Sequence, residues 1–362
     1  MALRICLIVP SFGVGGALKT AFKVFSQLSD DYDIHIIPLN FSGNLFNSVP
    51  KNFAIHDIGS GKAYFQMFKA VWLLKSTRPQ IVYLTHGYTV ALYYVVSILM
   101  GYISNVCYRE TSVLNKLYDE RGIKLWFQRI LSSWAYKKLD LIICQSNFMA
   151  REIDNFFGVN RNVMVVINNP AVGSYENHDI PKYCESGNKD KSFSLIYCGR
   201  LEPEKGVDRI INAMRYTCEN VFLKIIGNGS KMDELKKLCK SLDLCDRVSF
   251  HGYQSNPSYY IANSDALILT SLHESFSNSV LEANALGVPV LATECPGGLS
   301  ELIREDINGR LVEYKDSRTL AKSIEYFFEY EWDSQAIREF VFENFGLEKV
   351  KMAYMQAFEK LR

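Results

Sequence analysis

Residues 194–206 read SLIYCGRLEPEKG, which joins an apolar run to a turn that ends at a glycine. The run Ser194–Cys198 has the length and apolar character of a buried strand, and a helical pattern follows Gly206. The same succession of strand, turn and helix recurs along most of the chain. Because this alternation is typical of parallel sheets with helices on both faces, the sequence predicts an α/β fold.

The predicted strands form two series, one in each half of the chain. The first series is Leu3–Val9, Ile34–Leu39, Ile81–Leu84, Val106–Arg109, Leu141–Cys144 and Val163–Ile167. The second series is Ser194–Cys198, Phe222–Ile226, Val248–Phe250, Ala266–Leu269 and Val288–Ala292. We therefore expect two Rossmann-like, doubly wound domains at residues 1–175 and 193–333, a polar linker at 176–192, and C-terminal helices at 334–362 that pack across the domains. Ligands bind at the carboxyl ends of the strands in such folds, so we expect a site in a cleft between the domains.

The composition fits a folded chain of two domains and excludes several classes of protein. The chain has 362 residues, 48% of them hydrophobic and 22% charged, which exceeds the usual size of a single hydrophobic core. Its 40 Lys and Arg almost cancel its 39 Asp and Glu, so no strong positive field is available to bind nucleic acid. Nine cysteines without zinc-finger spacing argue against disulfides and structural zinc, and favour reduced thiols in the cytoplasm.

One long apolar segment requires a choice between a membrane span and a buried unit. Residues 79–108 contain no Asp, Glu, Lys or Arg. A transmembrane helix needs about 20 apolar residues. Here His86-Gly87 and Gly101 interrupt the run, which divides into a strand, a helix at about 89–100 and a second strand. Because buried parallel strands read as continuous apolar runs, we favour a buried strand–helix–strand unit.

A glycine turn follows the first strand. Residues 11–19 read SFGVGGALK, which places Gly13, Gly15 and Gly16 directly before a helix. Free amides at the start of a helix attract anions such as phosphate, and glycine lets a ligand approach the backbone. The third glycine of the dinucleotide motif G-x-G-x-x-G is replaced by Leu18. A tight turn without a ligand is an equally good interpretation of this segment alone.

Two cations lie on the loop that ends at Gly206. Arg200 and Lys205 follow the end of the strand, where they face the expected cleft and suit a diphosphate. Further along this domain, Gly227-Asn228-Gly229 is a second glycine turn after a strand, and Tyr253 is placed to flank a nucleotide base. Each of these features alone also fits an ordinary surface residue or connection.

The most informative segment is 274–282, ESFSNSVLE, which follows the strand Ala266–Leu269 and enters a helix. The same spacing of two glutamates recurs at 305/313 and 331/339, but only the first pair lies on a loop from a strand to a helix. Its small residues Ser277, Asn278 and Ser279 offer backbone amides to a phosphate. Ser279 and Glu282 also match a helix capping box, and both interpretations can hold together.

A histidine follows the strand Ile81–Leu84 of the first domain, in the sequence Leu84-Thr85-His86-Gly87. This position aims His86 at the expected cleft. We expect either of two roles for His86, with about equal weight: contact with a ligand, or the structural or solvated role that is usual for a single histidine.

Taken together, these motifs resemble those of the retaining glycosyltransferases of family four, which have the GT-B architecture. The matching positions are Gly15-Gly16, His86-Gly87, Asn169-Pro170, Gly199-Arg200, Lys205-Gly206, Gly227-Asn228-Gly229, Gly252-Tyr253, Glu274 through Glu282, Gly297-Gly298, Glu301 and Asn308-Gly309. Their order and spacing agree over most of the chain, which is more specific than any single motif. The resemblance implies two Rossmann-like domains that face each other across a cleft, with a C-terminal helix that crosses back.

The resemblance also implies roles for individual residues. Arg200 and Lys205 would neutralise the diphosphate of a nucleotide sugar, and Glu274 would hold hydroxyls of the donor sugar. Glu282 would accept hydrogen bonds from the ribose, and His86 would contact the donor sugar near the reacting carbon. The implied catalytic residues are Glu274, His86, Arg200 and Lys205, and the implied donor-binding residues are Gly15, Gly16, Gly227, Tyr253, Phe276, Ser277, Asn278, Ser279 and Glu282. A cationic clamp stabilises the charge that develops on the diphosphate, so no metal or other cofactor is expected.

The implied function is transfer of a hexose or N-acetylhexosamine, with retention of anomeric configuration, from a nucleotide sugar that we expect to be UDP-linked. The implied acceptor is a polyprenyl-linked or other glycan of a bacterial surface polysaccharide, such as lipopolysaccharide O-antigen. Two alternatives remain: a nucleotide-sugar epimerase or hydrolase of the same fold, and a catalytically silent relative that binds a partner. Ser275 and Ser277-Asn278 replace residues that are frequent in the family, which leaves the identity of the sugar open.

The triplet Asp31-Tyr32-Asp33 resembles a metal motif of the other major glycosyltransferase fold. Because it precedes a strand away from the expected donor site, we interpret it as a polar turn.

Two segments of the first domain mix aromatic and basic residues, at 62–78 and at 124–138. Residues 1–180 carry 17 basic and 12 acidic side chains, a balance of +5. Interfacial helices combine such features, so we expect a cytoplasmic protein that binds the anionic inner face of the cell membrane peripherally. The alternative is that both segments are ordinary helices whose apolar faces lie in the core.

Overall fold

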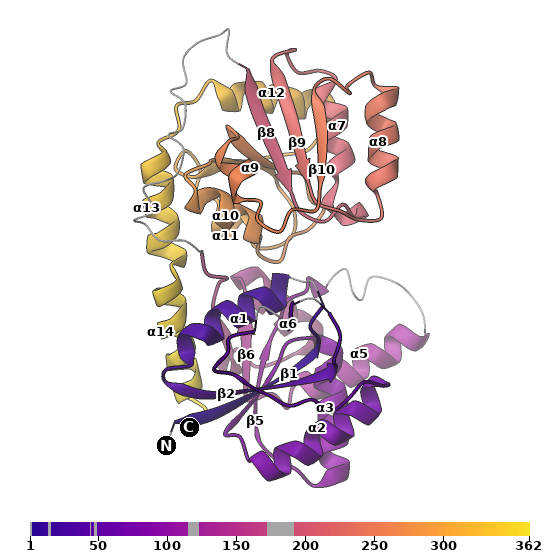
Figure 1. The fold of residues 1–362 in the computed structure, drawn as a ribbon, viewed down its shortest axis with the longest axis vertical. Helices are drawn as coiled ribbons and strands as arrows, with labels where there is room; N and C mark the ends of the chain where they lie inside the picture. The colour runs from indigo at the N-terminus through magenta and orange to yellow at the C-terminus, as the bar shows by residue number, and fades with distance from the viewer. Residues whose placement is uncertain (1, 14–15, 44, 47–48, 115–122, 172–191) are drawn as a thin grey trace. The chain divides into compact units, whose positions relative to one another are not determined.

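The computed structural model describes the whole chain except residues 1, 14–15, 44, 47–48, 115–122 and 172–191 (Figure 1). Most of the expected linker at 176–192 therefore lies outside the described residues. The chain divides into two compact units: unit 1 comprises residues 1–170 and 347–362, and unit 2 comprises residues 171–346. The C-terminal helices are divided between them, since α13 (Ser334–Phe345) belongs to unit 2 and α14 (Leu347–Glu359) belongs to unit 1.

Unit 1 is built on a parallel sheet of seven strands in the order β3-β2-β1-β4-β5-β6-β7. The strands are β1 (Leu3–Ser11), β2 (Tyr32–Asn40), β3 (Ala54–Ile55), β4 (Ile81–Leu84), β5 (Asn105–Arg109), β6 (Leu141–Cys144) and β7 (Met164–Val166). The strand order reverses between β1 and β4, which pair directly, with Ile5 opposite Ile81 and Ile8 opposite Leu84. This reversal is the switch point at which doubly wound folds bind ligands.

Helices cover both faces of this sheet. They are α1 (Gly16–Leu28), α2 (Ala63–Thr77), α3 (Gly87–Met100), α5 (Ile123–Tyr136), α6 (Asn147–Phe157) and α14, with a 3-10 turn η2 (Arg161–Val163) before β7. Successive strand side chains point to opposite faces, so Ile5 and Leu7 pack under α1 and α14, whereas Cys6 and Ile8 pack under the other helices. The sheet is thus buried on both sides, which is why its strands read as continuous apolar runs.

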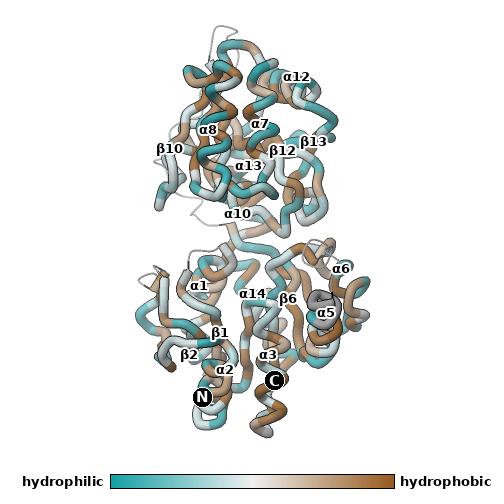
Figure 2. The backbone as a smooth tube through the Cα atoms, turned by 90° about the vertical axis from the view of Figure 1, so that its right-hand side faces the viewer, coloured by the Kyte–Doolittle hydropathy of each residue, from teal (hydrophilic) through white to brown (hydrophobic). Residues whose placement is uncertain are grey.

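The apolar segment at 79–108 forms the expected strand–helix–strand unit, made of β4, α3 and β5. No helix among the described residues has both the length and the apolar character needed to cross a bilayer. Figure 2 shows the hydrophobic character of α3 as a mostly brown tube.

A buried arginine on β5 connects two distant segments of unit 1. Arg109 is only 1% exposed. Its Nη2 donates a hydrogen bond of 2.6 Å to Asn169 Oδ1, and its Nη1 donates to the hydroxyl of Tyr354 on α14. Asn169 precedes the point where the chain leaves unit 1, and Tyr354 follows the point where it returns. Within unit 1, the buried Arg109 guanidinium therefore links the segment that precedes the exit of the chain to the helix that follows its return.

Unit 2 repeats the architecture with six parallel strands in the order β10-β9-β8-β11-β12-β13. The strands are β8 (Phe193–Cys198), β9 (Val221–Ile226), β10 (Val248–Gly252), β11 (Ala266–Leu269), β12 (Val290–Thr293) and β13 (Gly309–Val312). The helical elements are η3 (Pro203–Lys205), α7 (Val207–Met214), α8 (Met232–Ser241), α9 (Ser258–Ala262), α10 (Asn278–Ala285), α11 (Leu299–Leu302), α12 (Ser317–Phe328) and α13. The strand order reverses between β8 and β11. Both units thus confirm the predicted pair of doubly wound, Rossmann-like α/β sheets.

Candidate functional site

The two most informative loops of unit 2 leave neighbouring strands. β8 pairs with β11, with Leu195 opposite Ala266 and Ile196 opposite Leu267. The loop after β8 carries Arg200 and Lys205, and the loop after β11 carries Glu274. Because the strand order reverses here, these loops meet at the switch point of the sheet.

Lys205 and Glu274 form an ion pair between these two loops. The distance from Lys205 Nζ to Glu274 Oε1 is 2.6 Å, and the residues are 69 positions apart in the sequence. Ser271 Oγ donates a hydrogen bond of 2.8 Å to the same carboxylate oxygen. The side chains are 18% and 10% exposed, so solvent screens the pair only in part. The second oxygen, Oε2, accepts no hydrogen bond from the described part of the chain.

Close backbone contacts hold the Glu274 loop in place. Glu274 N donates to Pro296 O at 3.1 Å, and Gly298 N donates to Glu274 O at 2.9 Å. A Cβ at Gly297, whose φ is +138°, would lie 1.6 Å from Glu274 O. Only glycine allows this approach. The predicted pair Gly297-Gly298 therefore positions the backbone of the glutamate.

The Lys205 loop is anchored in a similar way to the end of β11. Gly206 has a φ of +59°, and a Cβ there would lie 2.4 Å from Thr270 O. Thr270 Oγ1 donates a hydrogen bond of 2.7 Å to Gly206 O. These contacts explain why a glycine follows Lys205 in the predicted motif.

Arg200 lies on the same loop but is mostly exposed. Its side chain is 68% exposed, and Nη2 lies 2.9 Å from Glu204 Oε1. The hydroxyl of Tyr197 donates to Arg200 O at 2.7 Å and fixes the backbone. Arg200 and Lys205 are thus both at the rim of unit 2, each paired with a carboxylate.

The second glycine turn packs against the first rim loop. A Cβ at Gly227 would lie 1.8 Å from Gly199 O, and a Cβ at Gly229 would lie 2.3 Å from Leu201 O. The Glu202 carboxylate accepts hydrogen bonds from Ser230 Oγ (2.6 Å) and Ser230 N (3.1 Å), which lower the pKa of Glu202. This motif accordingly has a structural role, whatever its ligand contacts.

The helix α10 begins at the small residues of the 274–282 segment. Ser277 is the N-cap residue and has extended backbone angles, and its Oγ lies 3.0 Å from Ser279 Oγ. Ser279 is already inside the helix, so it does not serve as the N-cap of the capping box that its spacing to Glu282 suggested. The amides of Asn278 and Ser279 lie in the first turn, as an anion site requires.

Glu282 and two thiols lie close to the rim. Burial raises the pKa of the Cys198 thiol to about 12, and the nearby Glu282 carboxylate adds to the shift. Burial likewise raises the pKa of the Cys295 thiol to about 12, with a further contribution from Glu274. The Glu282 carboxylate therefore lies near the end of β8. The sequence did not single out Ser271 or Cys295, whose only signal was their position after β11 and β12.

Two further predicted donor-binding residues differ in exposure. The Phe276 ring is buried and packs on Phe345 with ring centroids 5.6 Å apart, so the ring is part of the core of unit 2. Tyr253 follows Gly252 at the end of β10, and its side chain is 56% exposed.

The predicted residues of unit 1 lie at its own switch point. His86 follows β4 as the N-cap of α3, and its Nδ1 lies 3.0 Å from Thr85 Oγ1. Burial lowers the pKa of His86, so the ring is held neutral near pH 7. Gly16 begins α1, and Gly15 lies outside the described residues.

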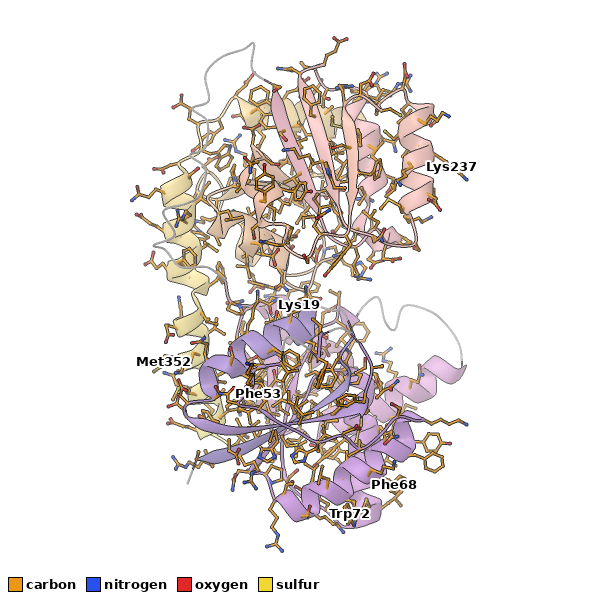
Figure 3. The ribbon with its side chains drawn as sticks, in the orientation of Figure 1. Lys19, Phe53, Phe68, Trp72, Lys237 and Met352 are labelled. Carbon is orange, nitrogen blue, oxygen red and sulfur yellow. The ribbon has the colours of Figure 1, made fainter. Side chains whose placement is uncertain are left out.

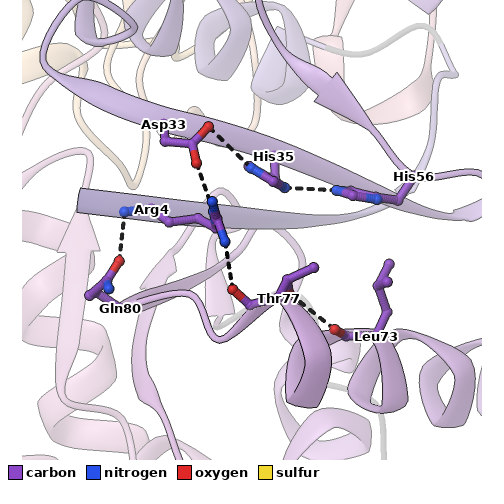
Figure 4. Close-up of polar contacts among 7 residues, drawn as sticks. All are labelled: Arg4, Asp33, His35, His56, Leu73, Thr77 and Gln80. Carbon is purple, nitrogen blue, oxygen red and sulfur yellow. Dashed lines mark hydrogen bonds and ion pairs between the residues drawn. The ribbon is translucent and has the colours of Figure 1, made fainter. Parts of the chain in front are cut away.

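The acidic triplet at 31–33 has structural partners, and Figure 4 shows those of Asp33. Asp33 Oδ2 lies 2.7 Å from Arg4 Nε, and Asp33 Oδ1 lies 3.1 Å from His35 Nε2. Asp31 Oδ2 lies 3.1 Å from Lys351 Nζ on α14. Burial alone would raise the pKa of Asp33, but the hydrogen bonds and charges of Arg4 and His35 lower it. The acidic side chains of this triplet therefore tie strands and a helix together.

A separate cavity of about 540 Å³ lies between α5 and α6 in unit 1. Its lining residues are Arg129, Ile130, Ser133, Trp134, Lys137 and Phe156. These residues come from the later part of α5 and the end of α6, whereas His86 lies at the carboxyl end of β4. The cavity is thus distinct from the predicted site residues.

Two family models match successive parts of the chain. Residues 14–171 match Glycosyltransferase Family 4, and residues 180–341 match Glycosyl transferases group 1. The boundary between the two matches falls within the segment that separates the two sheets.

Relatives of the chain are named as enzymes of bacterial glycan synthesis. A Campylobacter jejuni protein named as N-acetylgalactosamine-N,N'-diacetylbacillosaminyl-diphospho-undecaprenol 4-alpha-N-acetylgalactosaminyltransferase is 24% identical over 90% of each chain. The lipopolysaccharide core biosynthesis glycosyltransferase LpsE of Rhizobium meliloti is 28% identical over 52% of this chain and 54% of its own length. This chain thus spans only about half of the second relative.

A solved structure shares the fold over nearly the whole chain. The structure of Alr3699/HepE from Anabaena, in complex with UDP, has a TM-score of 0.79 and 17% sequence identity, and the match covers 99% of this chain and 100% of the other.

Proposed function

Because the chain belongs to the glycosyltransferases that have a Family 4 domain followed by a group 1 domain on the GT-B fold, we propose that it transfers a hexose or N-acetylhexosamine from a UDP-sugar, with retention of anomeric configuration. The proposed acceptor is a lipid-linked glycan in the synthesis of a bacterial surface polysaccharide. The observation that carries this proposal is the Lys205–Glu274 pair at the switch point of unit 2.

The chemistry of this pair suits a sugar diphosphate. The Lys205 ammonium has three donors and uses one on Glu274, so it is able to bind a diphosphate oxygen as well. Arg200 supplies a second, largely exposed cation on the same loop. Charge develops on the diphosphate as the bond to the sugar breaks, so cations and helix amides placed there stabilise the transition state.

The carboxylate of Glu274 is suited to hold the sugar. Its Oε1 is oriented by Lys205 and Ser271, whereas Oε2 is left to accept hydrogen bonds from sugar hydroxyls. The amides of Asn278 and Ser279 at the start of α10 supply donors for a phosphate. Glu282 would then accept hydrogen bonds from the ribose.

The names of the relatives support the choice of sugar and acceptor. The Campylobacter relative is named for transfer of N-acetylgalactosamine to a diphospho-undecaprenol glycan, and the Anabaena structure contains UDP. A Bacillus anthracis relative, 28% identical over 62% of this chain, is named N-acetyl-alpha-D-glucosaminyl L-malate synthase. A small soluble acceptor is therefore the second candidate to test.

The direct test is turnover of a panel of UDP-sugars by the purified chain, measured as UDP release with and without undecaprenyl-diphosphate glycans. Acceptor-dependent release from one UDP-hexose or UDP-N-acetylhexosamine, and a product with the anomeric configuration of the donor, are expected. Release without any acceptor would indicate a hydrolase, a changed sugar without transfer would indicate an epimerase, and absence of both binding and turnover would indicate a silent relative.

A further inference from the structure

One face of α2 exposes large apolar side chains to solvent. Phe65, Phe68 and Trp72 are 60%, 39% and 66% exposed. Their spacing of three and four residues places them on one side of the helix. Figure 3 shows Phe68 and Trp72 on the outer side of α2. The core of unit 1 takes the opposite side of the helix, where Met67, Val71 and Leu74 are fully buried.

The neighbouring helix continues this exposed face. α2 packs against α3, and Lys75 Nζ donates a hydrogen bond to Met100 O at the end of α3. Ile98 and Leu99, near the end of α3, are 58% and 70% exposed, and Ile103 in the loop that follows is 96% exposed. We call Phe65, Phe68, Trp72, Ile98, Leu99 and Ile103 the α2–α3 surface.

The charged side chains on α2 and at its two ends are of one sign. Residues 58–109 contain no Asp or Glu, whereas Lys62, Lys69, Lys75 and Arg78 are all exposed. Within the described residues, none of these four cations forms an ion pair with a carboxylate. The surface is therefore apolar, and α2 and its two ends border it with cations.

We propose that the α2–α3 surface docks unit 1 onto an anionic lipid bilayer. Isolated exposed apolar residues are common, but a cluster of this size on a folded chain marks an interaction site. Aromatic and aliphatic side chains enter the boundary between headgroups and acyl chains, while lysines and arginines contact anionic headgroups. This proposal rests on the proposed function only in that a lipid-linked acceptor would keep the enzyme at a bilayer.

The docking surface is separate from the candidate site. His86 precedes α3, and Ile98 lies 12 residues further along, so the two are roughly 18 Å apart along the helix axis at 1.5 Å per residue. Variants of the surface therefore leave the predicted site residues untouched. The second basic segment, on α5, is not included, since it lines the cavity with α6 and its first residues have no described side chains.

The test is flotation of the purified full chain with vesicles of phosphatidylglycerol and phosphatidylcholine, compared with phosphatidylcholine alone, at low and high salt. We expect flotation with the anionic vesicles at low salt and less of it at high salt. The variant Phe68→Ser/Trp72→Ser should reduce the partition coefficient roughly tenfold or more, because apolar insertion and charge act together. Lys62→Gln and Arg78→Gln should each reduce it roughly fivefold, which corresponds to one cation near an anionic surface.

The controls are Met352→Ser on α14 and Tyr259→Ser in unit 2, where the native side chains are 52% and 71% exposed. Both should float like the native chain. No flotation of the native chain at low salt, or unchanged flotation of Phe68→Ser/Trp72→Ser, would overturn the proposal. So would sedimentation showing a dimer that this variant breaks, because the occupant would then be a second copy. UDP release with a water-soluble acceptor fragment is measured in parallel. If a chain that does not float still releases UDP, the docking proposal has failed and the proposed function has not.

Discussion

Lys205 Nζ and Glu274 Oε1 lie 2.6 Å apart, although one residue follows β8 and the other follows β11. The pair forms because the crossover that reverses the strand order places these two strands side by side. The cation that we propose for the diphosphate and the carboxylate that we propose for the sugar are thereby oriented by each other.

We expect Glu274→Ala and Lys205→Ala to fold normally and to lose sugar transfer by about 10²- to 10³-fold in kcat/KM, since each removes a group that we propose acts in the transition state. The double variant should lose little more kcat/KM than the less active of the two single variants, because the two groups act as a unit. The measurement is steady-state UDP release.

The matched control for that pair is Lys315–Glu313, with Nζ and Oε2 3.2 Å apart and both side chains more than 60% exposed. Lys315→Ala and Glu313→Ala should leave turnover unchanged. Native turnover in either Glu274→Ala or Lys205→Ala would exclude the assigned roles.

A second prediction concerns the glycine behind the glutamate. Gly297→Ala should lower the free energy of unfolding by about 3 kcal/mol or more, because its Cβ meets Glu274 O and its backbone is strained. Gly252→Ala is the control: its φ is +67°, but no atom lies within 4 Å of the added Cβ, so only about 1 kcal/mol of backbone strain is expected. Urea unfolding of both variants gives the comparison, and equal losses would show that contact with Glu274 O has no effect.

A third prediction follows from the buried histidine of unit 1. Burial lowers the pKa of His86 from its ordinary value of 6.5, so below that pH the unfolded chain binds a proton more readily than the folded chain. The free energy of unfolding should therefore be insensitive to this group above pH 6.5 and should decrease as the pH falls below it. Unfolding at pH 7.5 and pH 5.5 should show a smaller decrease in His86→Gln than in the native chain. An equal decrease in both would contradict the prediction.

A fourth prediction concerns metal removal. Because Arg200 and Lys205 supply the positive charge at the proposed diphosphate site, EDTA should leave sugar transfer largely intact. The assay is UDP release before and after dialysis against EDTA. Loss of activity that returns with Mg²⁺ or Mn²⁺ would show that a metal ion, and not the cationic side chains alone, neutralises the diphosphate.

The sequence predicted the alternation of strands and helices because strands such as β4 (IVYL), β6 (LIIC) and β11 (ALIL) are short apolar runs between helical patterns. It missed β3 (Ala54–Ile55) and β13 (Gly309–Val312), since two residues and the sequence GRLV carry too little periodicity. It also placed Lys205 and Glu274 at the rim. The sequence did not predict the direct contact of Lys205 with Glu274, because the crossovers of the whole sheet decide which strands become neighbours.

Two further details of the site, the hydrogen bond from Ser271 and the first residue of α10, also depend on the folded path of the chain and not on local motifs. Ser271 carries no motif, and its hydrogen bond to Glu274 follows from the path of the loop after β11. Ser279 matched a capping box, but the helix starts at Asn278, two residues before the start at Val280 that this motif requires. Local spacing alone did not fix the first residue of the helix.

The position of α14 determines how this chain can be dissected in the laboratory. Its side chains Tyr354 and Phe358 are fully buried against β4 and α1, although Tyr354 is 271 positions away from Tyr83 of β4 in the sequence. A fragment that stops at residue 170 would leave that core open and would lose the hydroxyl that Arg109 binds. Expression of unit 1 alone therefore calls for residues 347–362 to be rejoined to residue 170 by a short linker, whereas unit 2 is a continuous segment and needs no such repair.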